Sequence, residues 1–320
     1  MPVYVFIERD ETKIRKTSYE AISYGAEIAS IVGNQVVGVV LGSIDKAELE
    51  GLSKFGCHKV IHCPDPVLDQ PMIRSYVSVL SELMEAEPAE FFITAQSALA
   101  DPVAAMLAVR TGASVATNVT SVPDLENGCR VQRGIYTGKA FETVELKSEK
   151  KVISIRKNAC GIKEYEINAE IVTSDLKPEE YSDVKITGAD KVKGDILLSE
   201  AKIIVSGGRG MKGPENWGMI EELADTLGAA KGCSKPVSDA NWRPHHEHVG
   251  QTGIKVSPDL YIAIGISGAI QHVAGVSASK FIVVINNDPE APFFKVADYG
   301  MLGDAFQIVP RLIESIKKYK

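Results

Sequence analysis

Four clusters of glycine, hydroxyl and basic residues in the last third of the chain have the composition of a phosphate-binding surface. They are SGGRG at 206–210, GCSK at 232–235, VGQTG at 249–253 and GISGAIQH at 265–272. Each is expected after a strand, at the carboxyl edge where open α/β sheets bind elongated phosphate-bearing ligands. Glycine lets the backbone approach a ligand closely, and free backbone N–H groups attract anions. These clusters predict a dinucleotide site.

Individual side chains within these clusters suggest roles, each with an ordinary alternative. Arg209 offers a fixed cation for a pyrophosphate or a ring, although a solvated arginine in a tight turn explains it equally well. The spacing around it is not GxGxxG, which argues against a standard NAD-binding unit. Lys235 can offset charge on a reduced ring or can be an exposed loop lysine. Cys233 is a candidate nucleophile, but no acid/base pair is evident to activate it.

The cluster at 265–272 gives the strongest phosphate signal. Ser267 and Gly268 open a predicted helix directly after an apolar strand, so the first helical amides can bind a phosphate while Gln271 and His272 face the cleft. A single histidine on such a helix is usually structural. The histidines at 245, 246 and 248 match no known zinc spacing, and we expect no metal there.

These clusters must be positioned by a doubly wound unit. Apolar strands alternate there with amphipathic helices, which gathers the loops at one edge of a sheet. Strands are predicted at 202–205, 260–265 and 281–286, and helices at 216–228, at 268–275 and from about 303.

The first part of the chain has its own strand and helix alternation, which predicts a parallel sheet. Strands are expected at 3–8, 35–41, 58–63 and 90–95, and helices at 17–32, 45–54, 70–86 and 98–111. Four later β-branched runs are interpreted as hairpin strands that extend this sheet: 131–136, 141–146, 151–156 and 167–172. The fold class is therefore α/β, with an N-terminal parallel-sheet domain carrying added hairpin strands (1–195) and a C-terminal doubly wound domain (196–320).

The composition of the chain argues against several classes of partner and indicates where the protein is found. The 320 residues carry a formal net charge of −7 and no long basic run, which argues against nucleic acid as a partner. Polar residues interrupt every apolar stretch, so no membrane insertion is expected. The chain enters a strand at once, without a leader, and its five scattered cysteines include no CxxC pair. We expect a cytoplasmic protein.

Taken together and in this order, SGGRG, GCSK, VGQTG, GISGAIQH, INNDPEAP and ADYG closely resemble the α subunit of electron transfer flavoproteins. The match is dense over 202–310 and looser, though collinear, before that. The resemblance implies that the C-terminal domain holds FAD in an extended pose and that the N-terminal domain packs against a separate β subunit. The FAD-binding residues it implies are Arg209, Ser234, Lys235, Gln251, Thr252, Gly253, Ser267, Gly268, Ala269, Gln271, His272, Asn286 and Asp304.

The resemblance also implies a place for each group along the cofactor. Thr252 would lie by flavin N5 and His272 near the pyrimidine edge, with Ser267 and the backbone around Gly268 at the phosphates. Asn286 would contact the central chain of the cofactor, and Asp304 would contact its adenosine end. Two positions depart from the family pattern: Lys235 stands where arginine is usual, and His248 stands where glutamine is common.

The resemblance favours an electron carrier more than an enzyme, with no catalytic residue of its own. Such a subunit takes electrons from a flavin dehydrogenase, such as an acyl-CoA dehydrogenase, and delivers them to a quinone-linked or flavodoxin-like acceptor. A bifurcating complex, in which NADH reduces a β-subunit flavin and electrons split between ferredoxin and an enoyl-CoA-type acceptor, is a second hypothesis. An NAD-dependent dehydrogenase and a flavin-free scaffold stay open.

The Lys235 departure generates a prediction. Lysine keeps the positive charge but lacks the planar guanidinium that can lie over a flavin ring. We therefore expect Lys235→Arg to shift the flavin midpoint potential measurably in spectroelectrochemical titration. An unchanged potential would place Lys235 away from the ring.

Overall fold

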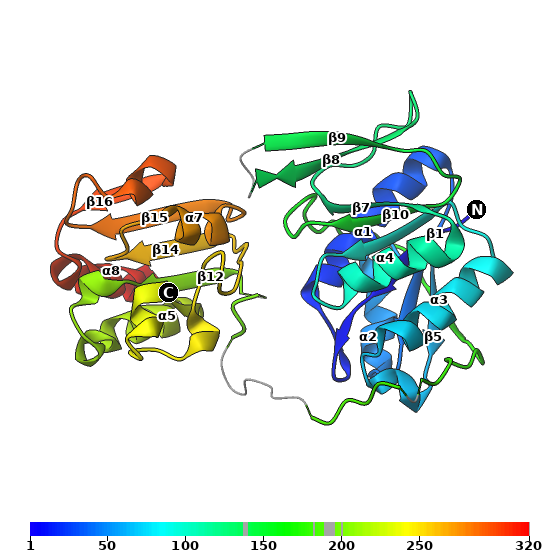
Figure 1. The fold of residues 1–320 in the computed structure, drawn as a ribbon, viewed down its shortest axis with the longest axis horizontal. Coiled ribbons are helices and arrows are strands. Elements are labelled where there is room, and N and C mark those ends of the chain that lie inside the picture. Colours follow the sequence, from blue (N-terminus) through cyan, green and yellow to red (C-terminus); the bar gives the residue numbers. More distant parts are fainter. Residues whose placement is uncertain (137–139, 182, 189–195, 200, 320) are drawn as a thin grey trace. The chain divides into compact units, whose positions relative to one another are not determined.

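The chain forms two compact units, Met1–Ala189 and Asp190–Lys320. The computed structural model, shown in Figure 1, describes residues 1–136, 140–181, 183–188, 196–199 and 201–319. The domain boundary predicted after residue 195 lies at the end of a segment outside these residues. Each unit has its own sheet and its own cores, so each is described by itself.

The first unit is built on one large sheet, for which the described residues supply nine strands in the order β11-β5-β4-β1-β6-β10-β7-β8-β9. The first seven run parallel, and the last two are antiparallel additions at one edge. The strands are β1 (Val3–Ile7), β4 (Val36–Leu41), β5 (Lys59–Cys63), β6 (Phe91–Ala95), β7 (Ser114–Val119), β8 (Cys129–Ile135), β9 (Ala140–Leu146), β10 (Lys151–Ile155) and β11 (Glu170–Thr173), with β2 (Arg9–Asp10) and β3 (Lys13–Ile14) forming a separate small ribbon.

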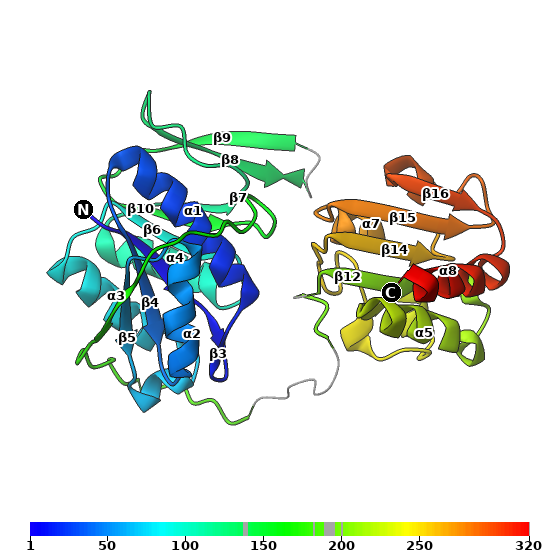
Figure 2. The ribbon, with the colours of Figure 1, turned by 180° about the vertical axis from the view of Figure 1, so that it is seen from behind.

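Helices cover both faces of this sheet (Figures 1 and 2). They are α1 (Lys16–Val32), α2 (Lys46–Gly51), α3 (Ile73–Ala86) and α4 (Ala100–Thr111). Because side chains alternate along a strand, Val5 of β1 faces the core shared with α1, whereas Tyr4 and Phe6 face the core shared with α3 and α4. Strands buried on both faces are typical of parallel sheets between helical layers.

One part of the sequence prediction for this unit is wrong. Residues 151–156 and 167–172 do not form hairpins: β10 lies between β6 and β7, parallel to both, and β11 pairs in parallel with β5 at the opposite edge. All five residues of β10 are buried, as expected of a central strand. The other two runs do form an antiparallel hairpin, β8–β9, so the predicted fold class is confirmed.

The second unit is a five-stranded sheet, parallel throughout its described residues, in the order β13-β12-β14-β15-β16. Its strands are β12 (Ile203–Gly207), β13 (Ala230–Cys233), β14 (Leu260–Ile264), β15 (Phe281–Asn286) and β16 (Tyr299–Leu302), and its helices are α5 (Gly218–Leu227), α6 (Lys235–Asp239), α7 (Ile270–Val276) and α8 (Ala305–Tyr319). From β12 the chain first adds β13 on one side and later β14 on the other. The strand order therefore reverses between β12 and β14.

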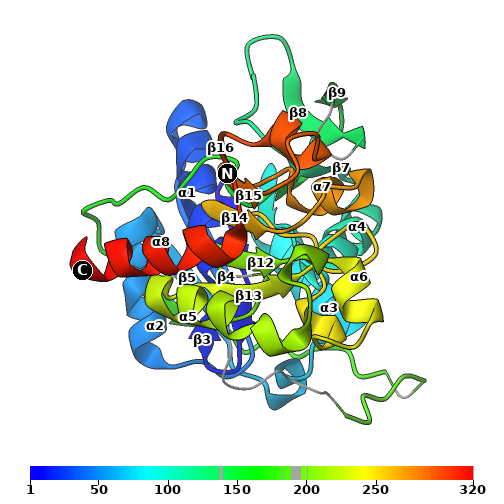
Figure 3. The same cartoon turned by 90° about the vertical axis from the view of Figure 1, so that its left-hand side faces the viewer.

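The helices of this unit pack on both faces of its sheet, as Figure 3 shows from the side. Ile220 of α5 and Val309 of α8 pack with Val205 and Ile262 in one core. The opposite core holds Tyr261 together with residues of α7 and of the loop before it. The predicted doubly wound architecture is confirmed. No helix in the described part of the chain is long and apolar enough to cross a bilayer.

The α5 core yields a stability prediction. Ile220 is fully buried, so Ile220→Ala leaves a cavity and is expected to lower the free energy of unfolding of the second unit by about 2–5 kcal/mol. Both tryptophans of the chain, Trp217 and Trp242, lie in this unit, so their fluorescence during urea unfolding reports the loss.

The matched control is Leu302→Ala on β16, because Leu302 is 59% exposed and its truncation is expected to change stability by less than about 0.5 kcal/mol. Equal losses in the two variants would show that the α5 face does not form the core of this unit.

Candidate functional site

A pocket of about 540 Å³ lies at the carboxyl edge of the second sheet. Its walls come from the ends of four adjacent strands: Arg209 follows β12, Ser234 follows β13, Ser267 follows β14, and Asn286 ends β15. This places the pocket at the reversal of strand order, where open α/β sheets bind ligands. Its volume is that of a small-molecule site.

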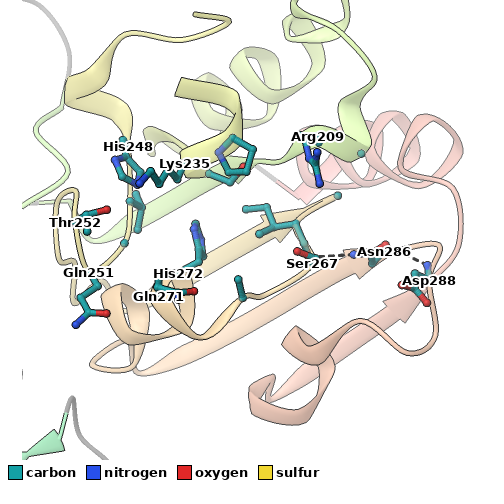
Figure 4. Close-up of a pocket in the computed structure, with 18 residues that line it drawn as sticks. Arg209, Lys235, His248, Gln251, Thr252, Ser267, Gln271, His272, Asn286 and Asp288 are labelled. Atoms are coloured by element: carbon teal, nitrogen blue, oxygen red, sulfur yellow. Dashed lines mark hydrogen bonds between the residues drawn. The ribbon is translucent and has the colours of Figure 1, made fainter. Parts of the chain in front are cut away.

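The pocket is elongated. Figure 4 shows its labelled side chains, with Gln251 and Thr252 at one end and Asn286 and Asp288 at the other. An extended ligand fits this outline better than a compact one.

Backbone contact between two glycine loops closes the sheet edge beneath the pocket. The N–H of Gly208 donates to Ile264 O at 2.9 Å, and that of Gly210 donates to Gly265 O at 3.0 Å. A Cβ atom on Gly208 would lie 2.2 Å from Gly265 O, and Gly265 itself adopts a φ of +61°. Only glycine allows this approach, so these positions join the β12 and β14 loops.

Two cations border the pocket. The side chains of Arg209 and Lys235 are exposed, and neither forms a salt bridge with another described residue. Unpaired cations around a concave site raise the local concentration of anions and can donate charge-assisted hydrogen bonds to phosphate.

The turn between β14 and α7 is shaped for close packing. Gly268 has a φ of +83°, and a Cβ atom there would lie 2.5 Å from the Cβ of Phe293. Phe293 N donates to Ser267 O at 3.1 Å, which fixes the turn. Ala269 and Gln271 of the α7 start then line the pocket, where the first helical N–H groups have no acceptor within the helix.

His272 is held on the pocket wall as a neutral imidazole. It is 7% exposed, and its Nε2 lies 2.9 Å from the hydroxyl of Tyr261, while its buried Nδ1 has no hydrogen-bond partner among the described residues. The Phe293 ring packs edge-on at 5.6 Å. Burial, reinforced by His248, lowers the pKa of His272 to about 4.

His248 is a second buried imidazole on the same wall. It is 3% exposed, and its buried Nδ1 also lacks a hydrogen-bond partner within the part of the chain that the structure describes. Burial, followed by the nearby His245 and Lys235, lowers its pKa below the ordinary value for histidine. Two buried ring nitrogens therefore stay unsatisfied next to the pocket, which is unfavourable unless a ligand supplies a partner.

Asn286 ties two loops together. Its Nδ2 donates to Ile266 O at 3.0 Å, and its Oδ1 accepts from the N–H of Asp288 at 3.1 Å. This amide fixes the β14 loop relative to the β15 loop at the far end of the pocket.

Comparison with known proteins identifies the family. A family model described as the electron transfer flavoprotein FAD-binding domain matches residues 197–277, and one described as the electron transfer flavoprotein domain matches residues 3–179. The alpha subunit of the electron transfer flavoprotein of Bacillus subtilis is 37% identical over 318 residues, which cover 99% of this chain and 97% of that one.

The chain belongs to the electron transfer flavoprotein alpha-subunit family. The alpha subunit of Syntrophomonas wolfei is 35% identical over 98% of this chain and 99% of its own length. The corresponding protein of Mycobacterium tuberculosis is 37% identical over 99% of both chains. The second unit is accordingly an FAD-binding domain, and FAD is its cofactor.

The features of the pocket itself, considered without the family comparisons, are those expected of a dinucleotide site. Its elongated outline, two unpaired cations, a helix start and two unsatisfied imidazole nitrogens match a ligand with a pyrophosphate and a polar ring edge. No group of three or more metal-ligating side chains is found in the described part of the chain.

The structure brings most of the predicted site residues to this one pocket. Those that line it are Arg209, Ser234, Lys235, Gln251, Thr252, Ser267, Ala269, Gln271, His272 and Asn286. Their contacts with FAD stay predictions. Gly253 and Gly268 lie behind the wall: the first packs on His248, and the second packs on Phe293. Asp304 caps α8, where its Oδ1 accepts from Phe306 N at 3.0 Å, and a contact with the adenosine end stays a prediction.

Several lining residues are additional to the predicted set: Gly210, Pro236, His248, Val249, Gly250, Gly265, Ile266 and Asp288. Most of them lie within the same motifs, so each motif contributes backbone as well as side chains. Cys233 is fully buried, and burial raises the pKa of its thiol to about 12. A thiolate nucleophile is therefore disfavoured at this position.

The neutral His272 predicts a pH dependence of stability. Its pKa is about 4 when folded and about 6.5 when unfolded, so only the unfolded chain takes up the proton as the pH falls through this window. The flavin-free protein should lose up to about 3 kcal/mol of unfolding free energy from this group between pH 6.5 and pH 4. The His272→Gln variant should lack this part of the loss in unfolding free energy, which tryptophan fluorescence during urea unfolding measures.

His246→Gln is the control, because His246 is exposed and should leave the pH profile unchanged. If wild type and His272→Gln lost the same free energy on acidification, His272 would not be a buried neutral imidazole.

Proposed function

We propose that this chain is the FAD-carrying subunit of a heterodimer that accepts electrons from a flavin dehydrogenase, such as an acyl-CoA dehydrogenase, and passes them to a downstream acceptor. The observation that carries the proposal is the pocket at the β12/β14 reversal, with its unpaired cations and neutral imidazoles. Family membership supports it independently. The bound FAD supplies the electron-accepting chemistry.

The residues of the chain bind and orient the cofactor. Arg209, Ser267 and the first amides of α7 hold its phosphates, because these groups offer positive charge and N–H donors along the middle of the pocket. Thr252 and Gln251 hydrogen-bond the ring at one end. Such an arrangement adjusts the redox properties of the cofactor and needs no group that processes a substrate.

The imidazole of His272 contributes a fixed hydrogen bond at the ring edge. Its Nε2 is engaged by Tyr261, so Nδ1 is the nitrogen left for a ligand. Because the ring is buried and neutral, it offers this contact without adding a full charge to the pocket.

The partner of this subunit in the proposal is the β subunit of an electron transfer flavoprotein, which packs against the domain formed by residues 1–195. The relatives are themselves named as alpha subunits, which supports such an assembly. We place the heterodimer in the cytoplasm, since all five cysteines are free and reducing compartments keep thiols in this state.

Co-purification with the β subunit tests the proposal. The complex should be yellow, should release FAD on denaturation, and should be reduced by a flavin dehydrogenase and its substrate. Colourless complex, or complex that binds NAD tightly and no flavin, would contradict the proposal. Reduction by NADH with simultaneous reduction of added ferredoxin would instead assign a bifurcating role.

The role of Arg209 gives a sharper test. A charge-assisted hydrogen bond is worth about 1.5–3 kcal/mol, so Arg209→Gln should raise the Kd of the complex for FAD by roughly tenfold to a hundredfold. Quenching of flavin fluorescence on rebinding to the deflavinated complex measures this change.

Lys212→Gln is the matched control. Lys212 is an exposed cation three residues away that lies over the Phe306 ring, outside the residues that line the pocket. If both variants weakened FAD binding equally, Arg209 would act only through the overall charge of this loop.

A further inference from the structure

The imidazole of His248 is enclosed by the glycine loop that follows it. A Cβ atom on Gly253 would lie 2.7 Å from His248 Nδ1, and a Cβ atom on Gly250 would lie 3.4 Å from its Nε2. The bare backbone of these two glycines therefore packs against the nitrogen edges of the ring. This packing explains how the ring is 3% exposed although it lines the pocket.

The backbone holds this imidazole in place. His248 N donates to His245 O at 3.0 Å, and His248 O accepts from Ile254 N at 2.8 Å. The preceding Glu247 is clamped by Arg243, whose Nε and Nη2 lie 2.7 and 2.5 Å from its two carboxylate oxygens. Since the turn is fixed on both sides, the ring stays beside the pocket.

The charges around His248 come from three elements. Lys235 and Asp239 face it from α6, His245 and Glu247 belong to its own turn, and His272 faces it from α7. The carboxylate of Glu247 is paired with Arg243, which also forms a salt bridge with Glu221.

Of the groups left, only Asp239 favours a proton on His248, whereas Lys235 and His245 oppose it. Figure 4 shows His248 beside Lys235. The ring is therefore neutral, because burial, His245 and Lys235 together outweigh the effect of Asp239. A negative charge gained within the pocket would reverse this balance.

We propose that His248 takes up one proton from solvent when the flavin in this pocket is reduced. This inference rests on the proposed function, because the electrons come from the flavin dehydrogenase and stay on the flavin. The proton comes from water, one N–H bond forms at the imidazole, and the imidazolium offsets the charge that the electrons add. A glutamine side chain, which is common in the family at this position, has no group basic enough to accept a proton.

His272, the other buried imidazole on the pocket wall, is less suited to this role. Its Nε2 is engaged by the Tyr261 hydroxyl, and its ring packs against Phe293. With a pKa of about 4, it stays neutral across the physiological range. Among the described residues, the one aromatic ring that packs near His248 is that of His245, with ring centroids 5.5 Å apart.

The test is the pH dependence of the flavin midpoint potential in the FAD-loaded heterodimer, measured from about pH 5 to about pH 8 for wild type and His248→Gln. One extra proton for each two electrons changes the reduction equilibrium tenfold per pH unit, which corresponds to about 30 mV. The potential of wild type should therefore fall with pH more steeply than that of the variant, by up to this amount. Parallel lines would overturn the proposal.

Two measurements keep the outcome decisive. His246→Gln changes an exposed histidine of the same turn and should retain the wild-type slope. In wild type, ring signals of labelled histidines followed by NMR should show one imidazole whose pKa rises on reduction of the flavin. If none rises, the proposal fails even where His248→Gln does not fold. Absence of bound flavin would contradict the proposed function instead.

Discussion

The contact between the loops that follow β12 and β14 is the constraint on which the site depends. Two backbone hydrogen bonds, from Gly208 to Ile264 and from Gly210 to Gly265, hold the loops at a separation that admits no Cβ atom. The loops after β13 and β15, which supply further walls of the pocket, flank these two loops in the strand order. Without it, the loops beyond the paired ends of β12 and β14 would separate, and the exposed Arg209 would have no fixed position relative to the α7 start.

The limits of most parallel strands could be predicted from the sequence alone. The alternation of apolar strands and amphipathic helices placed β15 at its observed limits, 281–286, and the other predicted strands of parallel type within one or two residues. Strand partners could not be predicted in the same way. β10 and β11 follow a hairpin along the chain, yet each joins a parallel strand elsewhere. All five residues of β10 are buried between two parallel neighbours, which stabilises this strand more than local pairing would. β11, whose residues are exposed or half-buried, instead adds to β5 at the sheet edge. Strand β16 lacked a signal, since all four of its residues are exposed.

The site was predictable because its chemistry lies in short motifs at strand ends. Glycine, hydroxyl and cationic residues mark these loops, and parallel strands bring their carboxyl ends to one edge. Motifs do not reveal which glycines face the ligand and which serve packing. Gly253 and Gly268 support His248 and Phe293, while Gly265 reaches the pocket wall itself. A motif also does not show which side chains are buried. His248 and His272 are both buried, neutral imidazoles because of the way the glycine loop folds over the sheet.

In the proposed complex the dinucleotide lies along the carboxyl edge of the second sheet. The most direct measurement is the crystal structure of the FAD-loaded heterodimer. We expect density for FAD across the ends of β12 to β15, with phosphate oxygens within hydrogen-bond distance of Arg209 and Ser267 and the ring near Thr252. Density for FAD bound to the first unit, with the second-unit pocket filled only by water, would show that the cofactor does not lie at this sheet edge.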